Sequence, residues 1–382
     1  MKIAVLKEVV PGEARVALVP ESCKKLVGKG LEPGIQTGAG GGASFSDEAY
    51  SAVGARLEGD AGALLAGADF VLTVQPPAES QIEQMRPGAM LLGSLLPMRN
   101  LAIIRKLAER NISAFSTDCI PRITRAQSMD TLSSMANLAG YKAVLIAAGE
   151  LPKYFPMLMT AAGTIHPAKV FVIGAGVAGL QAIATAHRLG ATITATDTRK
   201  AVAEQIHSLG AKFVGVESAE DAQTASGYAK ELSQEFYRKQ GELIGQQCAA
   251  ADVVVTTALI GGIKAPKLIT ADMVGRMQPG SVIVDLAAEG GGNCELTRPG
   301  ETIVVNGVKI FGPLNLPASV PKDASTLYSR NLTTFILAFW KDNAFNLDLQ
   351  DEIIKGALVT HGGAVLHAPS RAALEAAAAN SL

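Results

Sequence analysis

Short apolar runs alternate with stretches of helical periodicity along most of the chain. In the first third, apolar runs at residues 1–6, 69–75, 89–92 and 111–117 each predict a β-strand. Between the first two, residues 21–30 carry apolar side chains at helical spacing and end in glycine, which is typical of a helix and its C-cap. Strands that alternate with helices indicate an α/β layer with a mostly parallel sheet.

A second and clearer α/β series begins near residue 168. Its apolar runs predict strands at residues 169–173, 192–196, 212–215, 252–256, 281–285 and 309–311. Residues 130–151 contain no proline and predict a long helix between the two series, and residues 327–340 predict another helix. The tail after residue 323 holds too few elements for a domain, so we expect it to pack on the N-terminal domain.

The two series predict two domains, because 382 residues exceed what one hydrophobic core usually serves. We expect an α/β fold of two Rossmann-like domains with parallel sheets, separated by a cleft and linked by long helices. The first domain is discontinuous and takes residues 1–132 plus 323–382. The second takes residues 133–322.

Composition and charge exclude several classes of protein. A net charge of -1 without a basic stripe argues against nucleic acid as a partner. The four cysteines have no paired spacing, and the five histidines show no ligand spacing, so we expect neither a disulfide framework nor a metal site. The apolar runs are far shorter than the roughly 20 residues that span a bilayer, and the N-terminus lacks the pattern of a signal peptide. We expect a cytoplasmic protein whose tie to any membrane comes through partners.

The most specific motif is a strand followed by Gly-x-Gly-x-x-Gly and a helix. Gly174 permits the tight turn out of the strand, Gly176 lets the backbone approach a pyrophosphate, and Gly179 lets the helix sit close to the sheet. The start of the helix offers unpaired N–H groups to the phosphates. The alternative interpretation is an ordinary tight turn, but strand, glycines, helix and second strand all follow in the order of a dinucleotide-binding fingerprint.

An acidic residue ends the second strand of this series. Asp197 lies where its carboxylate can accept hydrogen bonds from the adenosine ribose and repel a 2′-phosphate, which favours NAD over NADP. Arg199 and Lys200 follow directly and leave two possibilities open. They can receive a phosphate, or they can be a solvated charge cluster.

Further segments carry a family resemblance. They are residues 7–20 (Lys-Glu, then Pro-Gly-Glu-Ala-Arg-Val-Ala and a closing Pro), 121–141, 157–164, 256–259 and 284–294. Together with the fingerprint they resemble the domain I component of proton-translocating transhydrogenase, which shares its fold with alanine dehydrogenase. The resemblance covers essentially residues 1–330 and is less distinct beyond.

The resemblance implies a loop beside the nicotinamide. It assigns the catalytic roles to Arg122, Gln127 and Asp130, with Ser133 close by. Arg122 and Asp130 are expected to fix the carboxamide, and Gln127 to bond a ribose hydroxyl of the facing nucleotide. Positioning is the main need of hydride transfer. The alternative interpretation makes Arg122 and Asp130 a helix-entry ion pair and cap.

The resemblance also implies a set of nucleotide-binding residues. They are Ile123, Thr124, Gly174, Gly176, Val177, Gly179, Asp197, Thr198, Arg199, Gly227, Tyr228, Thr257, Ala258 and Leu259. Gly227 and Tyr228 fall in residues 226–230, which match a mobile loop that closes over NAD(H) in the family. Two positions depart from the family pattern. Ser226 stands where a glycine is usual, and Gly261 where a proline is more frequent.

Two other functions compete with this interpretation. An alanine dehydrogenase-like enzyme needs a lysine and a histidine for proton transfer. In this chain Gln75 stands at the lysine position and residues 92–96 contain no histidine. Arg15, which holds a carboxylate in that family, is retained, and we interpret it as structural. A non-catalytic NAD-binding module stays open, because the chain has one dinucleotide fingerprint.

The resemblance implies partners as well. NAD(H) binds to this chain, and hydride passes directly to NADP+ on an NADP(H)-binding partner subunit. Membrane-spanning subunits then couple the transfer to proton translocation. We expect a homodimer, peripheral on the inner face of the membrane through those partner subunits.

Overall fold

The computed structural model describes residues 1–216, 233–259 and 265–379, and its contacts divide the chain into two compact units. Unit 1 comprises Met1–Met135 and Ala318–Leu382, and unit 2 comprises Ala136–Pro317. The sequence placed these borders at 132/133 and 322/323. The first border falls inside helix α6 (Thr131–Glu150), and the C-terminal segment belongs by its contacts to unit 1.

Unit 1 is built on a sheet in the order β19-β18-β6-β5-β4-β1-β2-β3. The strands are β1 (Lys2–Val5), β2 (Glu32–Gln36), β3 (Arg56–Glu58), β4 (Phe70–Leu72), β5 (Met90–Gly93), β6 (Ser113–Ser116), β18 (Leu358–His361) and β19 (Ala364–Val365). Strands β1 to β6 pair in parallel, and the C-terminal pair adds to β6 in antiparallel fashion. The chain reverses its direction of winding between β1 and β4, which makes that point the topological switch of the sheet.

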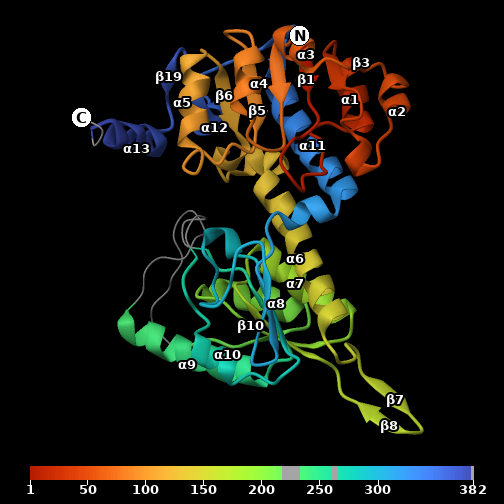
Figure 1. The fold of residues 1–382 in the computed structure, drawn as a ribbon, viewed down its shortest axis with the longest axis vertical. Coiled ribbons are helices and arrows are strands. Elements are labelled where there is room, and N and C mark those ends of the chain that lie inside the picture. The colour runs from red at the N-terminus through yellow and green to blue at the C-terminus, as the bar shows by residue number, and fades with distance from the viewer. Residues whose placement is uncertain (217–232, 260–264, 380–382) are drawn as a thin grey trace. The chain divides into compact units, whose positions relative to one another are not determined.

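Helices cover the sheet of unit 1 (Figure 1). They are α1 (Pro20–Val27), α2 (Asp47–Ser51), α3 (Ala61–Ala66), α4 (Glu79–Gln84), α5 (Leu101–Glu109), α11 (Pro321–Phe339), α12 (Glu352–Ala357) and α13 (Ala368–Ala379). The short 3-10 turns are η1 (Gly41–Ala43), η2 (Thr117–Cys119) and η3 (Thr124–Met129). Phe70, Phe115, Phe335 and Phe345 form an aromatic cluster that joins the sheet to α11 and the strand pair β16 (Trp340–Lys341) and β17 (Ala344–Phe345). The C-terminal segment thus supplies part of the core.

Unit 2 repeats the strand order of unit 1 over the first five strands of its sheet. Its sheet runs β11-β10-β9-β12-β13-β15-β14, with β9 (Lys169–Ile173), β10 (Thr192–Thr196), β11 (Lys212–Phe213), β12 (Val253–Thr256), β13 (Val282–Asp285), β14 (Thr302–Val305) and β15 (Val308–Phe311). Only β14 pairs antiparallel among these described strands. The connecting helices are α7 (Val177–Arg188), α8 (Ala203–Ser208), α9 (Gln234–Ala250) and α10 (Ala271–Gly275). The short 3-10 turns are η4 (Lys200–Val202), η5 (Ala288–Gly290) and η6 (Leu316–Ser319). Turn η6 crosses the border into unit 1.

A hairpin extends from unit 2 away from its sheet (Figure 1). Its strands β7 (Leu158–Thr160) and β8 (Gly163–Ile165) pair only with each other and expose every residue to solvent. Met157, Met159 and Ile165 are among the exposed large apolar side chains. These strands were not predicted from the sequence, because no buried face imposes an alternating pattern on them.

The expected fold class is confirmed, and so are the strands at 169–173 and 192–196. The strand expected at 69–75 is shorter, because the backbone amides of Val74 and Gln75 leave the ladder and donate to the Glu8 carboxylate. Strand β2 was missed since Pro33 and Gly34 disfavour a strand by propensity. Gly34 is suited to its place because a Cβ there would lie 2.8 Å from Leu64 Cδ1.

Helices α6 and α7 pack closely against each other beside the fingerprint turn. Gly140 of α6 lies against α7, where an added Cβ would overlap the Ala178 carbonyl oxygen. The absence of a side chain therefore lets α6 approach the helix that follows the fingerprint glycines. In the part of the chain that the structure describes, no helix has the length and apolar character needed to cross a membrane.

Candidate functional site

Two of the three fingerprint glycines are required by the fold, because a side chain at either position would collide with neighbouring atoms. Gly174 leaves β9 with φ +94, and a Cβ there would lie 2.6 Å from Thr257 Oγ1. Gly179, on the first turn of α7, packs so closely that a Cβ would overlap the Gly174 carbonyl oxygen. These two positions therefore make the tight turn and the close helix–sheet contact that the sequence predicted.

The third glycine leaves room for a ligand. A Cβ built on Gly176 meets no heavy atom within 4 Å. Gly176 is the N-cap of α7 and has no side chain to satisfy the N–H groups of the first turn, and Val177 beside it is exposed. Unpaired N–H groups at a helix start, next to open space, fit a phosphate. The residues present thus suit the pyrophosphate of a dinucleotide.

Asp197 lies directly after β10, beside this turn. Its Oδ2 accepts a hydrogen bond from the Ala175 backbone amide at 2.8 Å. Its Oδ1 accepts from the backbone amide and Nε of Arg199, both at 2.9 Å, and Oδ2 also accepts from Arg199 Nη2 at 2.9 Å. The carboxylate is therefore fixed at the carboxyl edge of the sheet, where the sequence pattern predicted a ribose ligand.

The surroundings keep Asp197 ionised. Burial by itself raises the pKa of Asp197, but the hydrogen bonds and charge of Arg199 and the amide of Ala175 outweigh it, so the pKa lies below its usual value. Of the two possibilities left open for Arg199, a solvated charge is wrong. Its side chain is only 20% exposed and pairs with Asp197.

A buried asparagine fixes the loop after β12. Asn293 is fully buried, and its Oδ1 accepts from Thr256 Oγ1 at 2.6 Å and from the Ala258 amide at 2.9 Å. Its Nδ2 donates to the carbonyl oxygens of Ala258 and Pro266 at 2.8 and 2.9 Å. Thr257, held between these contacts, places its Oγ1 3.3 Å from the Gly174 carbonyl. Thr257 and Ala258 are thus brought to the fingerprint turn, with Leu259 next in the chain.

A buried carboxylate holds the segment that carries this asparagine. Asp285, at the end of β13, accepts from the amides of Ala287 and Cys294 and from Thr297 Oγ1. Burial raises its pKa despite these bonds. In the sequence, residues 284–294 stood out only through the family resemblance. The one local feature that could have pointed to this structural role is the run of glycines directly before Asn293.

The predicted catalytic loop lies in unit 1. Arg122 and Gln127 are not buried, and Gln127 belongs to the 3-10 turn η3, whose N-cap is Ile123 and whose first residue is Thr124. Helix α11 packs against η3. The loop therefore presents polar side chains to solvent from a backbone that is fixed on its inner side.

Asp130 directly precedes helix α6. Its Oδ1 accepts from the Ser133 backbone amide at 2.8 Å, and its Oδ2 accepts from Ser133 Oγ at 2.6 Å. This is the geometry of a helix N-cap, so the capping interpretation of Asp130 is consistent with the structure. The cap also fixes the orientation of the carboxylate and brings Asp130 and Ser133 together, as a ligand group would require.

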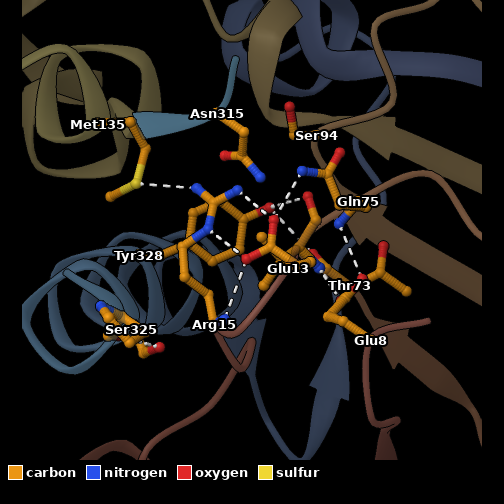
Figure 2. A network of polar contacts seen from close by, with 12 residues as sticks. Glu8, Glu13, Arg15, Thr73, Gln75, Ser94, Met135, Asn315, Ser325 and Tyr328 are labelled. Carbon is orange, nitrogen blue, oxygen red and sulfur yellow. Dashed lines mark hydrogen bonds and ion pairs between the residues drawn. The ribbon is translucent and has the colours of Figure 1, made fainter. Parts of the chain in front are cut away.

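A polar network occupies the carboxyl edge of the first sheet (Figure 2). Arg15 donates from Nε and Nη2 to the two oxygens of Glu13, at 2.8 and 2.6 Å, and both side chains are almost fully buried. Gln75 Nε2 donates to Glu13 Oε2 at 2.8 Å, and Arg15 Nη1 donates to Met135 Sδ at 3.2 Å. The bidentate pair and its links to the segment after β4 and to α6 fit a structural role for Arg15.

Glu8 lies at the topological switch of the same sheet and bonds the backbone amides there. Its carboxylate accepts from the backbone amides of Val74 at 2.6 Å and Gln75 at 3.3 Å, which ties the segment after β1 to the segment after β4. Burial raises the pKa of Glu8 to about 7, against the lowering effect of these two amides.

Several predicted residues lie outside the described residues. They are Ser226, Gly227, Tyr228 and Gly261. Thr198 is partly buried and follows Asp197. Among the residues that the structure describes, no three His, Cys, Asp or Glu side chains gather as a metal site would need, and the four cysteines are free thiols.

Comparisons with known proteins agree with this geometry. The family model for the alanine dehydrogenase/PNT N-terminal domain matches residues 4–139, and that for the C-terminal domain matches residues 143–368. The chain is 46% identical over 384 residues to NAD(P) transhydrogenase subunit alpha of Cereibacter sphaeroides, covering 99% of this chain and 73% of that protein. It is 30% identical to alanine dehydrogenase of Halomonas elongata, covering 92% of this chain and 91% of that protein.

Solved structures give the same picture. Transhydrogenase from Sinorhizobium meliloti matches with a TM-score of 0.88 and 45% identity, covering 96% of this chain and 100% of that one. An L-alanine dehydrogenase matches with a TM-score of 0.84 and 25% identity, covering 98% and 99%. The resemblance seen in the sequence is confirmed. The chain belongs to the alanine dehydrogenase/PNT family and, within it, to the NAD(P) transhydrogenase alpha subunits.

Proposed function

We propose that this chain is the NAD(H)-binding component of a proton-translocating NAD(P) transhydrogenase, an oxidoreductase. The bound NADH supplies a hydride at its nicotinamide ring for direct transfer to NADP+ held by a partner subunit. Membrane-spanning subunits couple the transfer to proton translocation, and the chain is cytoplasmic and peripheral on the membrane through them. The transhydrogenase names of its relatives support the activity.

The observation that carries the proposal is the open turn after β9. Gly176 leaves space for a ligand beside unpaired N–H groups, while Asp197 stands ionised at the neighbouring strand end. In this proposal Gly174, Gly176, Val177 and Gly179 hold the pyrophosphate, and Asp197 accepts from the adenosine ribose. Arg199, fixed by Asp197, stays beside the ribose. Thr257 and Ala258 line the remaining edge of the nucleotide site.

The loop of unit 1 orients the nicotinamide. Arg122 and Asp130 fix its carboxamide, Ser133 fixes Asp130, and Gln127 bonds a ribose hydroxyl of the facing nucleotide. Preorganised contacts of this kind suffice for hydride transfer between two nicotinamides, because no proton moves at the reacting carbons. The Asp130–Ser133 cap supports this role by holding the carboxylate in one orientation.

The site chemistry disfavours amino acid oxidation. In the alanine dehydrogenase family that reaction uses a lysine and a histidine to move protons. At the position after β4 stands Gln75, whose amide is bonded to Glu13 and does not titrate in the physiological range. Arg15, the other family position for that reaction, is bound by Glu13 as well.

A homodimer is included in the proposal. The hairpin β7–β8 exposes Met157, Met159 and Ile165 on a two-stranded ribbon without a sheet behind it. Isolated hairpins are marginally stable in water, and clustered apolar side chains on one favour a protein partner. A second copy of this chain is the partner we propose.

The decisive experiment reconstitutes the reaction. The chain is mixed with a purified NADP(H)-binding subunit, and reduction of an NAD+ analogue by NADPH is followed by absorbance. We expect turnover only when both proteins are present. L-Alanine with NAD+ should give no NADH, and clear turnover there would favour the dehydrogenase instead.

A matched pair of cap variants tests the loop. Asp130→Asn should slow hydride transfer about tenfold or more while NADH affinity changes less, because asparagine keeps the cap but loses the charge. Asp60→Asn is the control, since Asp60 caps α3 through the amides of Gly62 and Ala63. Equal effects of the two variants on transfer would show that Asp130 only builds the helix.

A further inference from the structure

The loop that carries Gln127 and Asp130 is held from the other end of the chain. Asn331 of α11 is 8% exposed, and its Nδ2 donates to the Ser128 carbonyl oxygen at 2.8 Å across 203 residues of sequence. Its Oδ1 accepts from Ser134 Oγ at 2.9 Å. One buried amide therefore holds the chain on both sides of Asp130.

The contact reaches Asp130 itself. Ser134 Oγ also lies 3.1 Å from the Asp130 carbonyl oxygen, and the Ser134 amide donates to the same oxygen at 3.3 Å. The carboxylate of Asp130 is in turn fixed by Ser133. A continuous path of hydrogen bonds thus runs from Asn331 through Ser134 to the backbone of Asp130.

A second tie to the C-terminal segment lies at the surface. Arg125 donates from both Nη atoms to the Asp351 carboxylate at 2.7 and 2.9 Å, and its side chain is 55% exposed. Exposed pairs contribute little, whereas a buried amide with two partners is costly to disturb. Asn331 is therefore the stronger restraint on this loop.

Only an amide suits the position. The Ser128 carbonyl needs a donor and the Ser134 hydroxyl needs an acceptor, and asparagine supplies both from one planar group. An ionised aspartate has the same shape but would direct an oxygen at the Ser128 carbonyl. The substitution would push the loop away without leaving a cavity.

We propose that Asn331 is a positioning residue for hydride transfer, which acts by fixing the backbone that carries Gln127 and Asp130. This inference rests on the proposed function, because that function makes Gln127 and Asp130 ligands. The identity of Asn331 then matters for the transfer step more than for the fold.

The test compares Asn331→Asp with a matched control, Ser329→Ala. Ser329 lies on the same helix, is fully buried, and accepts from the Val19 amide at 3.0 Å, away from the loop. For each variant we would measure the thermal midpoint, NADH affinity, transfer rate with the partner subunit, and hydrogen exchange of residues 123–134. Ser134→Ala removes the other arm of the contact and serves as a second variant if Asn331→Asp fails to fold.

We expect Asn331→Asp to slow transfer roughly 10- to 100-fold and to speed exchange in the loop, because small displacements are costly in hydride positioning. NADH affinity should stay within about twofold. Ser329→Ala should lower the thermal midpoint without either effect. Lowering the pH should partly restore the Asn331→Asp rate relative to wild type, since a protonated aspartate donates a hydrogen bond again.

The opposite outcome is as clear. If both variants change loop exchange and transfer alike, Asn331 is merely structural and the inference is overturned. Loop exchange is read without partner or nucleotide, so it tests the clamp even if the wild-type chain shows no transfer. An absence of hydride transfer by the wild-type chain would overturn the proposed function and leave the inference on Asn331 to the exchange measurement.

Discussion

The two sheets of this protein share the order of their first five strands and differ at the switch point. In unit 2, the strand before the switch, β9, is followed by the glycine turn, and the space at Gly176 is open. In unit 1, the corresponding strand β1 is followed by Glu8, which bonds the amides beyond β4 across the switch. Behind it, Arg15, Glu13 and Gln75 form a buried network.

The difference teaches that the fold alone does not make a nucleotide site. Ligands bind at the carboxyl edge of such sheets where the strand order reverses, provided that the backbone there is accessible. In unit 1 the Glu8 carboxylate bonds the backbone amides of Val74 and Gln75. In unit 2 Gly176 leaves the amides at the start of α7 without a side-chain cap, where we propose that the pyrophosphate binds. The residues just after β1 and β9 therefore decide which of the two switch points is open to a ligand.

The largest effect should come from Gly179, which packs against the Gly174 carbonyl, and not from Gly176, which faces open space. Gly179→Ala forces a side chain into the Gly174 carbonyl, so we expect unit 2 to lose about 1–3 kcal/mol and NADH affinity to fall by more than about tenfold. Gly176→Ala should leave the thermal midpoint unchanged yet weaken NADH. Calorimetry and fluorescence titration would separate the two. Unchanged NADH affinity in Gly176→Ala would mean that the open turn is not the pyrophosphate site.

A second prediction concerns the acid beside that turn. Asp197→Ala should weaken NADH roughly 10-fold, because one hydrogen bond to a charged group is lost. Arg199 then loses its carboxylate partner, so the ratio of NADPH to NADH affinity should rise. Arg199→Ala in the same background should abolish that rise. Binding of both nucleotides is measured by titration, and an unaltered NADH affinity would remove Asp197 from the site.

A third prediction concerns the switch point of unit 1, where Glu8 bonds the backbone amides of Val74 and Gln75. The pKa of Glu8 is raised from 4.5 to about 7 in the folded chain, so its stabilising contribution is complete below pH 4.5 and is lost as the pH rises through 7. Relative to Glu8→Gln, wild-type stability should fall by about 2 kcal/mol between about pH 5 and pH 8. Urea unfolding at several pH values measures this. Parallel pH profiles would show that Glu8 does not titrate in this range.

Local pattern was sufficient for much of the protein. The strands β9 and β10, the long helix α6 and the glycine turn were predicted because each depends on neighbours in the chain: apolar runs, helical spacing and backbone freedom at glycine. Strand β2 and the hairpin β7–β8 were missed, since Pro33 and Gly34 obscured the first and solvent on every side left no pattern in the second.

The sequence by itself determined the α/β class, the dinucleotide fingerprint and the family resemblance. Tertiary structure alone decided that Arg15 is bound by Glu13, that Arg199 pairs with Asp197, and that Asn293 and Asn331 fix the two loops. The reason is physical. Periodicity reports which face of an element is buried, but a polar side chain acquires its partner only when distant segments pack together and leave no water to bond it.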